Sequence, residues 1–312
     1  MKAVSPWPTS AFSLVQPTRI VPMAVTATTS EITGPRRGVV AALQHSLPRN
    51  ELFAGLYILG CVNGLLGRSI YTLNLEGWRG AVVGFEINVI VLAACFAGVY
   101  LIAANSRDRI RALDLVVTLA FLGLVTVPIY ALSWVAVTGL SLYILFFAND
   151  GCERRRGALI LLALAVPMLW SRLLFQFFAR PLLELDATMA AWLLGTERIG
   201  NLVRFADNSG YMVITPYCAS FGNVTYAFLC WVVVSQWVNH RWRSIDLLWL
   251  FLACASVVAI NVARIALIGQ SQENYQLIHG PGGYGFFLGT VFLCVIIGFS
   301  VIGARRELFH RA

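Results

Sequence analysis

Cys218 combines the residue type and the sequence position that a nucleophile requires. It follows Thr215-Pro216-Tyr217 at the start of an uncharged run that extends to Val238, and proline near such a start is a common signal for the first turn of a helix. The helix dipole and the unpaired N–H groups of a first turn favour a thiolate over a thiol. Cys218 is therefore a candidate nucleophile, and a structural thiol is the alternative.

An arginine and an asparagine lie together in the next apolar run, within Asn261-Val262-Ala263-Arg264. An arginine inside an apolar segment is costly, so its default interpretation is functional. The alternative is that Arg264 only extends its side chain to the nearby membrane interface. Asn261 precedes Arg264 by three residues, which places both on the same helical face, where the amide can orient the guanidinium.

His279 precedes the last uncharged run, within His279-Gly280-Pro281-Gly282. Histidine is the side chain that most often moves protons in catalysis, and an inert surface histidine is the alternative. A thiol nucleophile needs a base, and a tetrahedral intermediate needs a cation or N–H donors for its oxyanion. Cys218, Arg264 and His279 supply these functions together only if the fold places all three at one face.

The composition indicates what kind of fold must do so. The chain has 312 residues, of which 58% are hydrophobic and 12% charged, and its mean hydropathy is +0.74. A soluble fold cannot cover that much apolar surface with so few charges. The composition predicts a membrane protein of several helices, and it excludes a disulfide scaffold, a disordered chain and a nucleic-acid-binding domain. The seven cysteines form no Cys-x-x-Cys pair, so we expect no metal.

Apolar stretches of the length that a helix needs to span a bilayer recur along the chain, some of them with one charged residue inside. They predict about eight transmembrane helices: Leu52–Gly67, Ala81–Ala104, two helices between Asp114 and Asp150 that turn near Pro128 to Ser133, Gly157–Ala179, Cys218–Val238, Leu247–Ile268 and Gly285–Ala304. We divide the chain into a flexible basic cytoplasmic tail (1–50), a four-helix membrane region (51–156) and a catalytic membrane region (157–312).

Basic residues fall into alternate connections, as the positive-inside rule requires. The clusters 107–111, 154–156, 241–243 and 305–311 would all be cytoplasmic, whereas the outward connection 269–284 contains neither Lys nor Arg. Both termini are therefore predicted to face the cytoplasm. Cys218, the end of the span that carries Arg264, and His279 are predicted to share the outer face.

One outward segment is long. Within it, apolar residues between Leu182 and Leu193 mark an amphipathic helix that is expected to lie flat in the interface, with Glu184, Asp186 and Thr188 on its other faces. Two β-prone runs, 201–205 and 211–215, flank a turn sequence and predict a hairpin. The predicted fold is an all-α polytopic membrane protein with this interfacial helix and short hairpin before the sixth span.

These residues resemble the pattern of the exosortase/archaeosortase transpeptidases. That family has a Cys-led motif opening one span, an Asn-x-x-Arg near the end of the next, and a His before the last. Here the matching residues are Cys218-Ala219-Ser220, Asn261-Val262-Ala263-Arg264 and His279, and the resemblance covers about 157–303. The chain departs from the family in one motif, because the family usually has Cys-Ser-Gly where this chain has Cys218-Ala219-Ser220. The resemblance implies that the small residues after Cys218, Ser220 among them, would shape a substrate groove.

The resemblance implies a cysteine protease or transpeptidase of the bacterial inner membrane, with its active site on the outer face. Its partners would be membrane lipid, an unidentified acceptor, and secreted proteins that end in a sorting signal of a short motif, a transmembrane helix and a basic tail. The activity would be coupled to extracellular polysaccharide or to surface attachment. Cys218 would form a thioester, His279 would be the acid/base, Arg264 would stabilise the thiolate or oxyanion, and Asn261 and Ser220 would orient or bind substrate. No cofactor, metal or nucleic acid is implied.

Two other classes of protein fit the composition. A transporter or channel would use Arg264 and Glu86 to line a polar path, but the chain shows no internal repeat and no matched pair of broken spans. A non-catalytic membrane partner in polysaccharide export would keep Cys218 as a structural thiol. Replacing Cys218 by Ala separates these classes, because transport or assembly should survive the change and processing should not.

Overall fold

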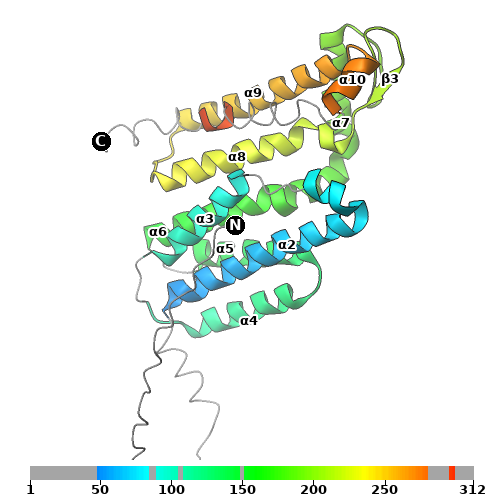
Figure 1. The fold of residues 1–312 in the computed structure, drawn as a ribbon. Helices are drawn as coiled ribbons and strands as arrows, with labels where there is room; N and C mark the ends of the chain where they lie inside the picture. The colour runs from blue at the N-terminus through cyan, green and yellow to red at the C-terminus, as the bar shows by residue number, and fades with distance from the viewer. Residues whose placement is uncertain (1–47, 84–88, 105–107, 148–150, 280–294, 299–312) are drawn as a thin grey trace, which may run out of the picture. The chain divides into compact units, whose positions relative to one another are not determined.

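The computed structural model describes residues 48–83, 89–104, 108–147, 151–279 and 295–298 (Figure 1). These residues are mostly helical, with one small sheet. The predicted tail (1–50) lies almost wholly outside the described residues, as do Glu86 and most of the predicted span Gly285–Ala304. In chain order the first helices are α2 (Arg49–Val83), α3 (Val89–Ala103), α4 (Ala112–Thr126), α5 (Tyr130–Phe146) and α6 (Cys152–Ala165).

The long uncharged run between Asp114 and Asp150 folds as two helices, α4 and α5, that turn between Thr126 and Tyr130. Pro128 lies in this turn, where its missing N–H and fixed φ are tolerated. The predicted turn is therefore confirmed. By contrast, α2 extends to Val83, well beyond the predicted end of the first span at Gly67.

The predicted interfacial helix is not a separate element. A π-helical turn, η1 (Val166–Trp170), joins α6 to α7 (Ser171–Leu194), which runs through the whole predicted amphipathic segment. Phe178 breaks the helical dihedrals (φ −117°, ψ 18°), three residues before Pro181, and a proline ring inside a helix displaces the preceding turn. The helix changes direction at this kink instead of ending there. Gly195 then ends α7 with φ +68°, a conformation that glycine adopts without strain.

The predicted hairpin forms and gains a third strand. Strands β1 (Arg198–Ile199), β2 (Leu202–Arg204) and β3 (Tyr211–Val213) pair antiparallel in that order, with Val203 opposite Met212. The chain then continues into a 3-10 turn, η2 (Pro216–Cys218), and three helices. These are α8 (Ser220–Trp237), α9 (Ser244–Ile268) and α10 (Gln272–His279). Figure 1 shows α8 and α9 side by side, with α10 and β3 at one end of α9.

The main core lies among α2, α3, α5, α6 and α8 and is built of apolar side chains. Helices α3 and α6 approach each other very closely at Gly157 and Gly98. A Cβ added to Gly157 would lie only 2.7 Å from the backbone oxygen of Gly98. Small residues at a crossing allow the backbones of membrane helices to come together. This contact fixes α6, and through η1 it fixes the start of α7.

A buried polar network joins the helices at the end opposite to Cys218. Arg49 on α2 donates to both carboxylate oxygens of Asp114 at 2.7 and 2.8 Å, and the Tyr143 hydroxyl donates to the same carboxylate at 2.7 Å. The Arg49 backbone N–H donates to the Asp108 carbonyl, and the Asp108 carboxylate pairs with Arg154 at 3.2 Å. Three chain connections that sequence analysis places on one side of the membrane therefore meet in the structure.

Arg156 extends this network to the end of α8. Its guanidinium donates to the carbonyl oxygens of Gln236, at 2.7 Å from Nε, and of Trp237, at 3.0 Å. These carbonyls belong to the last turn of α8, where the helix dipole favours a cation. The described members of the basic clusters thus gather at one end of the helices.

Among the described residues, three helical segments are long and apolar enough to cross a membrane: Arg49–Ile70, Cys152–Leu194 and Ser244–Ile268. Shorter apolar helices coincide with α3, α4 and α5. Exposed large apolar side chains are spread over these helices, for example Phe96, Leu119 and Phe251, as expected for surfaces that face lipid. The described chain is consistent with a membrane protein, and the count of eight spans stays a prediction.

Candidate functional site

Cys218 lies two residues before α8 and not in its first turn. It is the last residue of η2, its backbone N–H donates to the Thr215 carbonyl at 2.9 Å, and the extended Ala219 caps α8. The Thr215 hydroxyl donates to the Cys218 sulfur at 3.5 Å. This contact and the backbone hydrogen bond both come from Thr215, so one residue orients the Cys218 backbone and side chain together.

Asn261 on α9 holds the Cys218 segment in place. Its side-chain amide donates from Nδ2 to the Cys218 carbonyl oxygen at 2.7 Å and to the Ser220 hydroxyl oxygen at 3.0 Å. Asn261 is fully buried, and its Oδ1 has no hydrogen-bond partner within the described part of the chain. The structure thus brings together three of the five predicted site residues, with Asn261 as the link between them.

Asp186 is a site residue that the sequence analysis missed. It was placed on a polar face of the interfacial helix, but its side chain is only 3% exposed and accepts the Ser220 backbone N–H at 2.8 Å. That N–H belongs to the first turn of α8, where N–H groups lack helical partners. Asp186, which lies on α7 and precedes Ser220 by 34 residues, therefore caps the start of α8. An acidic residue among the small residues Ala187, Ala190 and Ala191 is the sequence signal for this inward face.

The sheet positions the residues that lead into η2. Asn201 and Ile214 exchange hydrogen bonds, since the Ile214 N–H donates to the Asn201 carbonyl and the Asn201 amide donates to the Ile214 carbonyl, both at 2.9 Å. The Ala206 N–H donates to the Gly269 carbonyl at the end of α9, also at 2.9 Å. Hydrogen bonds from the Ser209 side chain and backbone hold the pKa of Asp207, in the turn, below its ordinary value.

Apolar packing completes this support. A second core, separate from the one between the main helices, contains Cys218 and Ala219 together with side chains from α7, the sheet and α9. Its members are Leu183, Ala187, Ala190, Ala191, Val203, Phe205, Met212, Ile214, Ile265 and Ile268. The second half of α7, the sheet and α9 therefore share one core around the candidate nucleophile, so elements that precede α8 in the chain and one that follows it position Cys218 together.

Cys218 lines a cavity of about 200 Å³. The other lining residues are mostly apolar, among them Met212 and Ile214 of the sheet region, Ile265 on α9 and Tyr275 on α10. A lining of this kind suits an apolar side chain. Cys218 is buried, with 8% of its surface exposed, and it borders this cavity.

Arg264 lies on α9 one turn after Asn261, as predicted. Its Nε is buried and has no hydrogen-bond partner among the described residues, and the hydrogen bonds described around Cys218 do not include it. His279 is the last residue of α10, and its side chain lies outside the described residues. Its neighbour Ile278 packs against the core that contains Cys218, so the α10 backbone reaches the site.

The described residues contain no group of three or more His, Cys, Asp or Glu side chains that could hold a metal ion. The arrangement around Cys218 instead consists of a thiol, a hydroxyl, a buried amide and a carboxylate that caps the following helix. Comparisons of the chain with protein-family models, with curated proteins and with solved structures gave no match.

Proposed function

We propose that this chain is an integral membrane cysteine protease or transpeptidase of the exosortase/archaeosortase type. It removes the C-terminal sorting signal of secreted proteins at the outer face of the inner membrane. The observation that carries the proposal is the Asn261 side chain, which donates to both the Cys218 carbonyl and the Ser220 hydroxyl beside a mostly apolar cavity. A thiol held this firmly next to a cavity suits attack on a bound carbonyl better than passive packing.

The chemistry proceeds in two acyl transfers. His279 accepts the Cys218 proton as the sulfur attacks the scissile carbonyl carbon, and Arg264 donates hydrogen bonds to the resulting oxyanion. The carbon–nitrogen bond then breaks, the proton passes from His279 to the leaving amine, and the substrate stays on Cys218 as a thioester. An acceptor amine or water gives its proton to His279 and attacks the thioester, which releases the thiolate.

In this proposal the chain spans the membrane about eight times, with both termini in the cytoplasm. Support comes from the described contacts of the basic connections, which join Arg49, Asp108 and Arg154 at the end of the helices opposite to Cys218. A membrane-impermeant thiol reagent tests the orientation. Applied from outside, it should label Cys218 and leave the exposed Cys152 untouched until the membrane is opened; labelling of Cys152 alone would reverse the topology.

The acyl-enzyme provides the test of the chemistry. The protein is co-expressed with a secreted protein that ends in a short motif, an apolar helix and basic residues, and hydroxylamine-sensitive adducts of summed mass are sought. We expect the adduct in the parent chain or in His279→Ala, where residual thiolate attacks slowly and the adduct then persists because the acceptor is not deprotonated. Cys218→Ala should form none, whereas Cys152→Ala, with its thiol exposed at the other end, should behave as the parent. An adduct in Cys218→Ala would refute the proposal.

A further inference from the structure

Strand β3 forms one edge of the sheet, since the strands lie in the order β1-β2-β3. The Ile214 N–H donates to the Asn201 carbonyl at 2.9 Å, so the backbone groups of Ile214 point to the side on which β2 lies. Met212, two residues earlier, pairs with β2 in the same way. Because successive residues of a strand direct their backbone groups to opposite sides, the N–H and C=O groups of Tyr211 and Val213 point away from β2.

These outward backbone groups are available for pairing. Within the described part of the chain, no hydrogen bond reaches the outward groups of Tyr211 or Val213. Proteins usually protect such an edge with a charged residue or a proline, whereas residues 211–215 read Tyr-Met-Val-Ile-Thr and contain neither. The side chains of Tyr211 and Val213 are 46% and 52% exposed. The edge is therefore a template to which another extended chain can add.

The edge opens onto the cavity that Cys218 lines. Four consecutive residues, Met212 to Thr215, line this cavity with Cys218. Side chains of an extended chain alternate between its two faces, so a run of consecutive residues borders one space along an edge. Strand β2 covers the other edge of β3, and the cavity therefore follows the open one. Its volume of about 200 Å³ is below the usual range of drug-sized ligand sites, about 300–1,000 Å³, and suits single side chains of a peptide.

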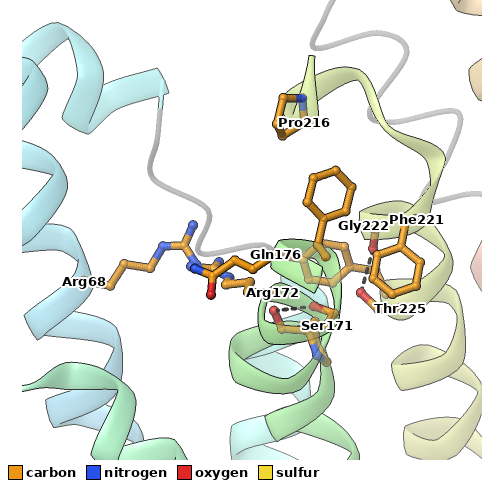
Figure 2. Close-up of a pocket in the computed structure, with 11 residues that line it drawn as sticks. Arg68, Ser171, Arg172, Gln176, Pro216, Phe221, Gly222 and Thr225 are labelled. Carbon is orange, nitrogen blue, oxygen red and sulfur yellow. Dashed lines mark hydrogen bonds between the residues drawn. The ribbon is translucent and has the colours of Figure 1, made fainter. Parts of the chain in front are cut away.

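A second cavity beside the η2 turn lacks these features. It has a volume of about 340 Å³ and is lined by Pro216 and by residues of neighbouring helices (Figure 2). The backbone groups of helices are bonded within each helix, and Figure 2 shows the Thr225 hydroxyl bonded to the Gly222 carbonyl one turn earlier. Among its described lining residues there is no strand and no Cys218. A peptide that must reach the thiol is therefore better received along β3.

We propose that the substrate segment that carries the scissile bond binds as a further strand along the open edge of β3. This inference rests on the proposed protease function and specifies how its site holds the substrate. The outward groups of Tyr211 and Val213 lie about 7 Å apart, the spacing at which an extended peptide repeats its own groups. Main-chain hydrogen bonds of this kind give affinity, and pockets for alternate side chains give specificity.

The cavity then selects one substrate side chain. Ile265 and Ile268 of α9 line it opposite the edge residues, so the side chain that enters should be apolar and uncharged. Cys218 follows Val213 by five residues, at the end of the η2 turn. An added strand therefore carries its next peptide carbonyls toward the thiol, with the backbone already extended.

The first test removes one outward N–H and leaves the pairing of β2 with β3 intact. Val213→Pro lacks the N–H that would bond the substrate, and proline is tolerated on edge strands when its missing N–H faces outward. With a co-expressed secreted precursor that ends in a short motif, an apolar helix and basic residues, we expect processing to slow about tenfold, since a hydrogen bond is lost. The Tm of the purified variant, measured in detergent, should stay close to that of the parent.

The matched control places the same substitution on the opposite edge of the sheet. The Arg204 N–H donates to the Glu197 carbonyl at 3.0 Å, so the backbone groups of Arg198, the next residue of β1, point away from β2. Arg198→Pro therefore removes an outward N–H from the edge that does not border the cavity, and it should process the precursor as the parent does.

Hydrogen exchange of single backbone amides provides a second measurement that needs no proline variant. In the Cys218→Ala chain, which cannot cleave, the precursor should slow exchange of the Val213 amide about tenfold or more, whereas the Met212 amide is protected with or without precursor. An unchanged Val213 amide, or one already protected without precursor, overturns strand addition, as does parent-like processing by Val213→Pro; the protease function stands if the parent still processes. A slowed Val213 amide with no processing by the parent keeps the binding mode and refutes the protease function.

Discussion

The side-chain amide of Asn261 donates a hydrogen bond to the carbonyl oxygen of Cys218 at 2.7 Å, across 43 residues of sequence. The same nitrogen donates to the Ser220 hydroxyl, so one buried side chain fixes the residues on both sides of Ala219. The candidate nucleophile is therefore positioned by α9 as much as by the helix that it precedes.

Asn261→Asp should abolish processing with little change in side-chain volume. The carboxylate has no proton to donate, and it repels the carbonyl oxygen that the amide held. Loss of one buried hydrogen bond costs about 1–3 kcal/mol, which a lower Tm of the purified protein would register. Asn274→Ala, which removes only a 3.5 Å contact to Leu267, should leave both activity and Tm near the parent values; equal damage from the two changes would contradict the role of Asn261.

Asp186→Ala should destabilise the start of α8 by about 1–2 kcal/mol, the usual cost of losing an N-terminal cap. Asp186→Asn keeps a side-chain oxygen that can accept the Ser220 N–H, so its Tm should lie between those of the parent and Asp186→Ala. Glu184→Ala is the control on the same helix, because its ion pair with Arg180 is largely exposed and such pairs contribute little. Thermal unfolding of the three variants distinguishes these expectations. A loss in Glu184→Ala as large as in Asp186→Ala would show that the cap is not the cause.

Arg264→Lys should be nearly as damaging to processing as Arg264→Ala. Lysine keeps the charge but lacks the planar guanidinium, whose two N–H groups can donate to one oxyanion together. Removal of one donor to an oxyanion typically lowers kcat by about 10²–10³-fold. The rate of signal removal in intact cells measures this. Near-parent activity of Arg264→Lys would mean that Arg264 acts only as a point charge.

Gly157→Ala should destabilise the contact between α3 and α6. The added methyl group would lie 2.7 Å from the Gly98 backbone oxygen and 2.9 Å from the Ile102 side chain, and overpacking of this kind costs about 1–3 kcal/mol. Gly139→Ala is the control, since nothing lies within 4 Å of its added methyl group. Thermal unfolding in detergent compares the two variants, and an unchanged Tm for Gly157→Ala would show that the helices can separate without loss.

Much of the helical pattern is readable from the sequence because it depends on local composition. The runs that became α5, α8 and α9 are uncharged over most of a span, and the turn after Thr126 follows from Pro128 and from the length limit of one span. The continuity of α6, η1 and α7 was not predicted. The amphipathic pattern that begins at Leu182 indicates a new helix. In the structure the same residues continue α7, and the helix only kinks at Phe178.

The site was predicted in its residue types more than in its contacts. Cys218 and Asn261 were named from their residue types and positions, Ser220 was named from the family resemblance, and the structure joins all three. The burial of Asp186 was not foreseen, because its partner is a backbone N–H of another helix and a backbone group leaves no trace in composition. Cys218 lies in a 3-10 turn ahead of α8 because its N–H donates a hydrogen bond to the Thr215 carbonyl, three residues earlier.

The C-terminal masses of secreted proteins test the central claim most directly. Cells that carry the parent chain, Cys218→Ala or Cys152→Ala are compared for secreted proteins whose genes encode a short motif, an apolar helix and a basic tail. Cells with the parent chain or Cys152→Ala should release these proteins without that tail, and cells with Cys218→Ala should retain the full-length C-terminus. Identical, shortened C-termini in all three cultures would contradict a nucleophilic role for Cys218.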